Sequence, residues 1–283
     1  PIAASARWFP DRKGLAVGLT ILGFGLSPLI TAPLARMIID HYGPLRTMGV
    51  LGLAFLIIIV ALSAPLRTPP ADWKPVGWAP PAQASTAKYL DTRSMLRTPT
   101  FYGLWLCYII GTLTGLMAIG ISSPVGQEVI KLDPAAAALT VSVFAVFNGV
   151  GRPLFGWVTD RLTPRNSAII SFVIIILASV GMLGAGEGQI ALYILCFVGF
   201  WLTLGGWLAI APTATATFYG AKNYARNYGV MFTAYGIGAI AGNLISGRLR
   251  DLFGSYLTSF YPTAALAAVG IALATTLLKP RKK

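Results

Sequence analysis

The chain has 283 residues, of which 55% are hydrophobic and only 11% are charged, and its mean hydropathy is +0.70. Soluble domains carry about 25% charged residues, and disordered chains combine low hydrophobicity with high net charge. These figures exclude a soluble enzyme and a disordered chain, and they predict an all-α integral membrane protein. The net charge of +13 requires no nucleic acid, because loops on one side of a membrane carry an excess of cations.

Apolar runs along the chain predict the membrane helices. A bilayer core of about 30 Å needs about 20 such residues per helix. We expect eight helices, at 15–38, 47–66, 100–122, 137–158, 166–186, 189–217, 228–247 and 256–278. The expected domains are a helix pair at 1–66, a cytoplasmic Pro-rich linker at 67–99, and a six-helix half with a basic cytoplasmic tail at 100–283.

The distribution of cations predicts the orientation. With loops placed alternately on two sides, sixteen of the 22 Lys and Arg residues share a side with both termini. Arg152 falls inside a span, and five cations fall on the other side: Arg36, Arg46, Lys131, Arg248 and Arg250. Because cytoplasmic loops are enriched in Lys and Arg, both termini are predicted to be cytoplasmic. An even number of spans likewise requires both termini to lie on the same side of the membrane.

A weak internal repeat appears when the chain is shifted against itself by 211 residues. Gly18 then aligns with Gly229, Phe24 with Tyr235, Gly25 with Gly236, and the tetrapeptide 40–43 with 251–254. Parallel repeats of six helices occur in one large class of secondary transporters. The repeat predicts that helices upstream of Pro1 once completed an N-terminal half. The alternative is a native eight-helix protein, which leaves helices 100–211 without repeat partners.

Arg152 is the candidate substrate anchor. It stands in VFNGVGRPLFGW, about 15 residues into its span, where a charge costs at least about 2.5 to 3.5 kcal/mol. No acidic residue lies in a neighbouring span, so backbone carbonyls, water or an anionic substrate must compensate it. Asn148 lies one turn earlier on the same face. The alternative is a structural arginine whose side chain snorkels to the cytoplasmic end of the helix.

Two further groups of residues are candidates for gating and for lining the cavity. In GWVTDRLTPR, which begins at Gly156 and ends at Arg165, Asp160 can bond a neighbouring helix N-terminus and Arg161, holding one gate state. A solvated basic loop is the alternative. Trp207 and Tyr235 stand among mid-span glycines and can wall a small carboxylate, or else they pack against neighbouring helices or lipid.

The sequence contains no evident group of residues for catalysis or for binding a metal. His41 is the single histidine, and Cys107 and Cys196 lie in apolar runs typical of packed core residues. An enzyme would need a nucleophile with a base or a metal cluster. We therefore expect no enzymatic activity, no metal and no cofactor. No carboxylate at mid-span is available for proton coupling.

Several segments together resemble the oxalate/formate antiporter family of the major facilitator superfamily, along essentially the whole chain. They are WFPDRKGLAVGL, TPPADWKPVGWAPP, NGVGRPLFGWVTDR, APTATATFYGAKNYARNYGVMFTAYGIGA and SGRLRDLFGSY. The resemblance implies twelve helices, of which about eight are present here, in a bacterial cytoplasmic (inner) membrane. It also implies exchange or uptake of small carboxylates by alternating access of two bundles about a central site.

The resemblance implies roles for two candidate residues. Arg152 matches the family's substrate-binding arginine in its eighth helix, whereas Tyr235 stands where oxalate-exchanging members carry a second, cationic anchor. A single cation suits a monocarboxylate such as formate, lactate or pyruvate better than oxalate. We expect a monomer in the lipid bilayer with a small carboxylate as its partner. The alternatives are a truncated, transport-incompetent fragment with only a structural role, and a channel, which the repeat and the lone buried arginine favour less.

Overall fold

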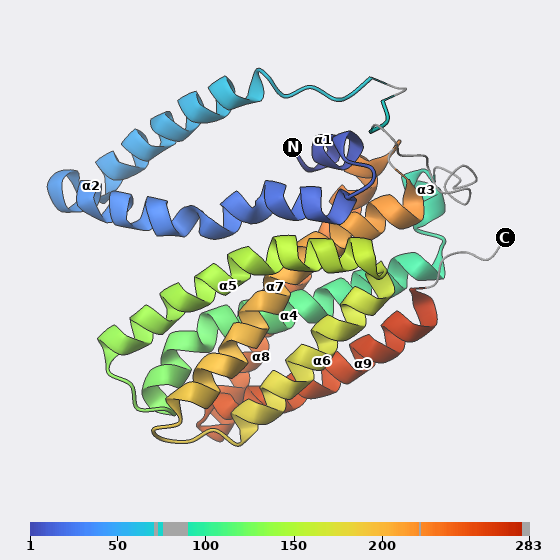
Figure 1. The fold of residues 1–283 in the computed structure, drawn as a ribbon. Helices are drawn as coiled ribbons and strands as arrows, with labels where there is room; N and C mark the ends of the chain where they lie inside the picture. The colour runs from blue at the N-terminus through green and yellow to red at the C-terminus, as the bar shows by residue number, and fades with distance from the viewer. Residues whose placement is uncertain (71–72, 76–89, 221, 279–283) are drawn as a thin grey trace.

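The computed structural model describes residues 1–70, 73–75, 90–220 and 222–278, apart from the side chains of residues 28, 29, 32, 33 and 36. Much of the expected linker, at 71–72 and 76–89, and the expected basic tail at 279–283 lie outside the described residues, as does the side chain of Arg36. The described chain is a bundle of helices without strands (Figure 1). The all-α prediction is confirmed.

The helices follow the predicted spans closely. In chain order they are α1 (Ile2–Trp8), α2 (Lys13–Ser63), α3 (Thr92–Met95), α4 (Pro99–Glu128), α5 (Pro134–Arg161), α6 (Pro164–Leu183), α7 (Ile190–Tyr219), α8 (Tyr224–Phe253), a 3-10 turn (Tyr256–Ser259) and α9 (Phe260–Leu277). Three of them begin with the same local signal. Thr98, Asp133 and Thr163 each cap a helix whose first residue is proline, a position where the missing N–H is not needed.

Seven segments of the described chain are long and apolar enough to cross a membrane. They correspond to the second to eighth predicted spans, beginning with Met37–Ser63. The first predicted span, at 15–38, differs, because its described apolar part, Lys13–Ser27, is shorter than a full crossing. The helical backbone nevertheless continues beyond Ser27 within α2.

Gly43 divides α2 into two arms. Its φ of 74° and ψ of 166° interrupt the helix, and the chain reverses there, so that the two arms form an open V (Figure 1). Gly254, its partner in the internal repeat, also has a positive φ, of 73°, and ends α8. Glycine adopts positive φ without a steric penalty, which explains why both copies of the tetrapeptide end in it. The second arm is largely exposed, because only 6% of its most apolar stretch is buried within the protein.

Glycines set the closest helix contacts in the bundle. A Cβ on Gly151 of α5 would collide with the carbonyl of Leu202 in α7, and one on Gly205 of α7 would collide with the carbonyl of Asn148 in α5. Gly242 of α8 lies in the same way against Leu113 of α4. Small residues let membrane helices approach to backbone contact, where van der Waals packing stabilises them. These contacts fix α5 against α7, and α8 against α4.

Several connecting segments gather at one end of the bundle, here called the linker end: α1, the start of α2, the end of α5, α3 and the start of α8 (Figure 1). Trp8 and Trp73 pack edge to face, with ring centroids 4.9 Å apart, and the Trp73 indole donates to the carbonyl of Trp8. Asp91 caps α3, and hydrogen bonding from Ser94 lowers the pKa of its carboxyl group. Leu90 bonds to Asn227 of α8, so the end of the expected linker is fixed to the bundle.

Candidate substrate site and gate

Arg152 belongs to α5, and its side chain lies against the first arm of α2. Its side chain is 2% exposed, and its guanidinium is 5.0 Å from the ring centroid of Phe24. Gly25 of α2 leaves the room that the guanidinium occupies, because a Cβ there would stand 3.0 Å from Cζ of Arg152. The buried charge therefore sits at the contact between the first helix pair and the six-helix half.

The Arg152 side chain runs into the bundle and away from the linker end. Its backbone lies beside Gly18, whereas its guanidinium reaches Ile21, Phe24 and Gly25, which are further along α2 from the linker end. At 1.5 Å per residue, these three positions are about 12 to 18 Å from the start of α2. A snorkelling arginine would point the other way. The geometry therefore does not match the snorkelling alternative.

The guanidinium is only partly satisfied within the protein. One terminal nitrogen donates to the carbonyl of Ile21 and the other to Oδ1 of Asn148, at 3.0 Å, while Nε is buried with no partner. Among the described residues the ion pairs are Arg12 with Asp11 and Arg250 with Glu128, so no carboxylate pairs with Arg152. A buried cation with unused donors is a suitable receptor for an oxyanion.

Tyr235 of α8 lies near this charge. Its phenol group and that of Tyr108 in α4 lie in the surroundings of the Arg152 guanidinium. The Tyr235 ring stacks on Phe232, with centroids 5.1 Å apart. Phe24 and Tyr235 are partners in the internal repeat, and both approach Arg152 from opposite halves of the chain. The two repeat copies therefore contribute aromatic side chains to one buried charge.

Asn148 holds the arginine in place. Its amide oxygen accepts from Arg152, and its amide nitrogen donates to the carbonyl of Trp201 in α7, at 3.3 Å. Both ends of the amide are thus engaged within the protein. The arrangement gives Asn148 an orienting role, in which it fixes the guanidinium relative to α7.

Trp207 lies deeper in the six-helix half. It is fully buried, it packs where Gly111 of α4 leaves space, and its ring is 5.2 Å from that of Phe172 in α6 and 6.1 Å from that of Tyr108. Its indole nitrogen has no hydrogen-bond partner. The structure brings Trp207 into contact with Tyr108 rather than with Arg152.

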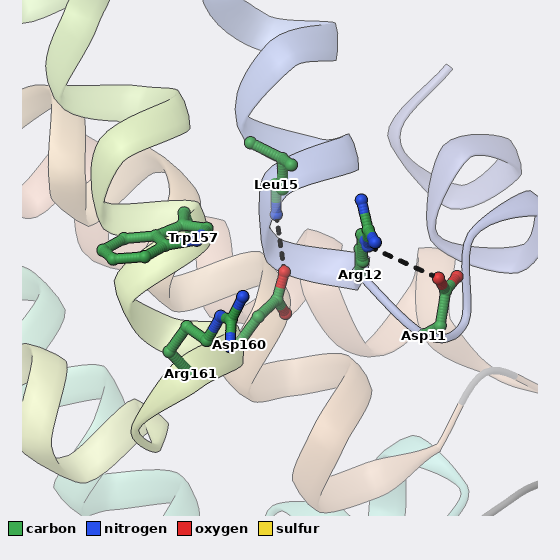
Figure 2. A pocket seen from close by; sticks show the side chains of 6 residues that line it. All are labelled: Asp11, Arg12, Leu15, Trp157, Asp160 and Arg161. Carbon is green, nitrogen blue, oxygen red and sulfur yellow. Dashed lines mark hydrogen bonds and ion pairs between the residues drawn. The ribbon is translucent and has the colours of Figure 1, made fainter.

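Asp160 joins α5 to the start of α2 at the linker end. Its two carboxylate oxygens accept hydrogen bonds from the backbone N–H groups of Gly14 and Leu15, at 2.7 and 2.8 Å. Figure 2 shows the bond from Leu15. These groups belong to the first turn of α2, where N–H groups have no intrahelical acceptor and the helix dipole favours an anion. Beside this bond Gly14 and Gly156 are in backbone contact. The carboxylate therefore joins α5 to the start of α2 at the linker end.

Arg161 and Arg165, the two cationic gate candidates, do not take part in this bond. Arg161 lies over the Trp157 ring, 5.9 Å from its centroid, and both line a surface pocket of about 420 Å³ together with Asp160 (Figure 2). The expected bond from Arg161 to Asp160 is absent from the ion pairs of the described residues. Arg165 stands in the first turn of α6, where its Nε is buried with no partner.

The sequence analysis did not identify the α2 residues that contact Arg152 and Asp160. Gly14 and Gly18 form a GxxxG pair, a spacing that places two small residues on one helix face and favours close helix packing. In the structure Gly14 faces Gly156, and Gly18 faces the backbone of Arg152. The glycine spacing was a usable signal for a helix interface, although it did not indicate which helix lies opposite.

Known proteins can now be compared with this arrangement. The model of the Major Facilitator Superfamily matches residues 1–242. The chain belongs to this superfamily. Among solved structures it resembles the E. coli fucose:proton symporter FucP, with a TM-score of 0.66 and 14% identity, covering 97% of this chain and 72% of the symporter. This likeness supports a major facilitator fold for the bundle.

Two curated relatives are carboxylate transporters by name. The chain is 31% identical to the oxalate:formate antiporter of Oxalobacter formigenes over 98% of this chain and 66% of the antiporter. It is 30% identical to monocarboxylate transporter 13 of Bos taurus over 98% of this chain and 62% of that protein. The resemblance to the oxalate/formate antiporter family is confirmed, and these major facilitator relatives are transporters rather than enzymes. The chain spans slightly less than two thirds of their length.

Proposed function

We propose that this chain is part of a secondary transporter that moves small carboxylates across a membrane by alternating access. The observation that carries the proposal is the buried Arg152 guanidinium, which has an unused Nε and no carboxylate partner among the described residues. A carboxylate of the substrate supplies the missing negative charge. The names of the two relatives support this class of substrate.

The site takes a monocarboxylate in preference to oxalate. Arg152 provides one cation, Asn148 orients it, and Tyr235 offers a neutral hydroxyl in its surroundings. A dianion such as oxalate would leave its second carboxylate in a low-dielectric site without a matching cation, which is costly. Formate, lactate and pyruvate each need only one cation. Trp207 supports the site from behind, through Tyr108.

Asp160 is the latch of the cytoplasmic gate in this proposal. The excess of cations assigns the linker end to the cytoplasm, where Gly14, Gly156 and the Asp160 bonds hold α2 against α5. Releasing these bonds lets the two halves separate and exposes Arg152 from the cytoplasm. Arg161 and Arg165 stay on the α5 and α6 side of the gate and attract the anion toward it.

The substrate preference can be tested by restoring the second cation. Tyr235→Lys should raise oxalate counterflow at least about tenfold relative to formate, because a charge-assisted pair replaces an unmatched carboxylate. The assay is counterflow in proteoliposomes, using this chain and the same chain extended by any coding sequence upstream of Pro1. Tyr235→Phe is the control and should leave oxalate transport low. Equal oxalate transport by the parent and Tyr235→Lys would contradict the single-cation explanation.

The latch can be tested by chemical accessibility. Asp160→Asn should increase labelling of Leu15→Cys by a membrane-impermeant maleimide by about 2- to 30-fold, since the charged cap contributes about 0.5 to 2 kcal/mol. The background should carry Cys107→Ala and Cys196→Ala, although both native thiols are buried. Asp11→Asn is the matched control, because Asp11 lines the same pocket but bonds to Arg12 rather than to α2. If both variants label alike, Asp160 is no latch.

A further inference from the structure

Four aromatic residues form a ladder along one face of α8: Tyr224, Tyr228, Phe232 and Tyr235. They are spaced by three or four residues, which places side chains on one side of a helix. Successive ring centroids are 5.7, 5.7 and 5.1 Å apart. The ladder begins at the linker end and reaches Tyr235 after about 16 Å of helix, at 1.5 Å per residue. It therefore leads from the linker end to the surroundings of Arg152.

Tyr108 of α4 packs against this ladder. Its ring centroid is 6.4 Å from that of Phe232, and the phenol groups of Tyr228 and Tyr235 lie in the surroundings of its own. The Arg152 guanidinium has Tyr108 in its surroundings as well. The stacked Trp207 ring, with its centroid 6.1 Å away, helps to fix the Tyr108 ring. A hydroxyl group of α4 therefore lies among the aromatic side chains near the buried charge.

The Tyr108 hydroxyl has an unused hydrogen-bond donor. Tyr108 is fully buried, and its hydroxyl has no hydrogen-bond partner. A buried hydroxyl without a partner costs free energy, and most such groups in proteins are satisfied. The nearby Tyr228 hydroxyl does not remove this deficit, because two hydroxyls that bond each other use only one of their two O–H groups. The pair can therefore donate a hydrogen bond to one further oxygen atom.

Open space lies beside the ladder. Nothing stands within 4 Å of the position that a Cβ would occupy at Gly229 or Gly236, the residues that follow Tyr228 and Tyr235. Phe232, between them, is 41% exposed, and both tyrosines are half-buried. Glycine is less favourable than alanine inside a helix, and contact with the described helices does not explain these two. The described residues therefore leave room for a small molecule along this face of α8.

We propose that Tyr108 and Tyr228 bind a second, uncharged oxygen of the substrate while Arg152 binds its carboxylate. The substrates are then hydroxy and oxo monocarboxylates, such as lactate and pyruvate, rather than formate or unsubstituted acids. Neutral hydroxyls suit a hydroxyl or keto oxygen, which needs a hydrogen bond but no opposite charge. Formate has no atom beyond its carboxylate that can reach a second group. This inference rests on the function proposed above and narrows its class of substrates.

Two acids that differ only in this oxygen provide the test. Lactate and propionate have the same charge and the same number of carbon atoms, but only lactate carries a hydroxyl. In proteoliposome counterflow at low substrate concentration, the parent chain should exchange lactate at least about tenfold faster, because a site built to bond a hydroxyl rejects the analogue without it. Tyr108→Phe and Tyr228→Phe should each lower lactate exchange about tenfold and propionate exchange less than about twofold.

Tyr102→Phe is the matched control. Tyr102 also belongs to α4 but is 51% exposed, and its loss of a hydroxyl should leave the preference for lactate unchanged. Thermal unfolding of the purified chain gives a readout that does not require transport. The lactate concentration needed for half of the stabilising effect should be about tenfold lower than that of propionate in the parent chain, and about equal to it in Tyr108→Phe and Tyr228→Phe.

The outcomes separate this inference from the proposed function. If the parent chain treats lactate and propionate alike, or if its preference survives Tyr108→Phe and Tyr228→Phe, the inference is wrong while carboxylate transport stands. An equal loss of both acids in these variants would assign the two hydroxyls a structural role and would also overturn it. If the parent chain neither exchanges nor binds lactate, propionate or formate, the inference and the proposed function fail together.

Discussion

Replacing Arg152 with alanine is expected to lower carboxylate exchange in proteoliposomes by about 100-fold or more. Truncating one partner of a buried, hydrogen-bonded charge pair costs about 2 to 5 kcal/mol, and alanine removes every donor that the arginine offers to a carboxylate. Arg152→Lys should recover only part of the activity, because an ammonium keeps the charge but not the planar fork. The measurement is counterflow of labelled formate, lactate and pyruvate, with unlabelled substrate inside the vesicles.

Folding effects can be separated from binding effects in this series. Arg152 also bonds Ile21 and Asn148, so its loss weakens the contact between α2 and α5. Thermal unfolding with and without carboxylate gives the required second measurement: the parent chain should be stabilised by substrate and the alanine variant should not. Arg248→Gln serves as the control for loss of an exposed cation. Undiminished exchange by a folded Arg152→Ala variant would assign the arginine a purely structural role.

Gly205→Ala is expected to be among the most destabilising single-methyl changes in the bundle. A Cβ at this position meets the carbonyl of Asn148, which is backbone and has no rotamer through which it can move away. Overpacking of this kind costs about 1 to 3 kcal/mol, measurable as earlier unfolding in a titration with SDS in mixed micelles. The change also displaces Asn148, which orients Arg152, so substrate-induced stabilisation should weaken as well.

Gly247→Ala is the matched control for this prediction. Gly247 lies in α8, and nothing stands within 4 Å of the position that its Cβ would occupy. Alanine has the higher helix propensity, so this variant should be neutral or slightly more stable. If the two alanine variants unfold alike, close approach of α5 and α7 at Gly205 is not what holds that contact together.

Composition and local signals were enough to predict most of the helices. Threonine or aspartate followed by proline marks the starts of α4, α5 and α6 because these signals act within one turn. The continuous path of α2 as far as Gly43 was harder to predict. The positive φ of Gly43 breaks the helix within the loop expected between the first two spans. The sequence signal for this break was the repeat of the tetrapeptide that ends in Gly43 and, in its second copy, in Gly254.

The candidate site could be predicted only in part, for a different reason. A charge inside a span stands out in one sequence, which is why Arg152 and its neighbour Asn148 could be found. The partner of Arg152 in α2, Ile21, is 131 residues away in the chain, and no local pattern indicates such a pairing. The Asp160 bond to Gly14 and Leu15 likewise joins segments far apart in sequence. Such contacts depend on how helices pack, which hydropathy alone does not specify.

The contact between α2 and α5 has a mechanical consequence. At Gly14 and Gly18 it is made by backbone against backbone, whereas further along the helices Leu22 and Leu26 of α2 lie against Gly149 of α5. Separating interlocked side chains requires rotamer changes along the whole seam, whereas two smooth backbone surfaces can part with little rearrangement. The end of the contact at Gly14 and Gly18 can therefore open without side-chain rearrangement. The barrier to opening would be concentrated in a few breakable bonds, at Asp160 and Arg152.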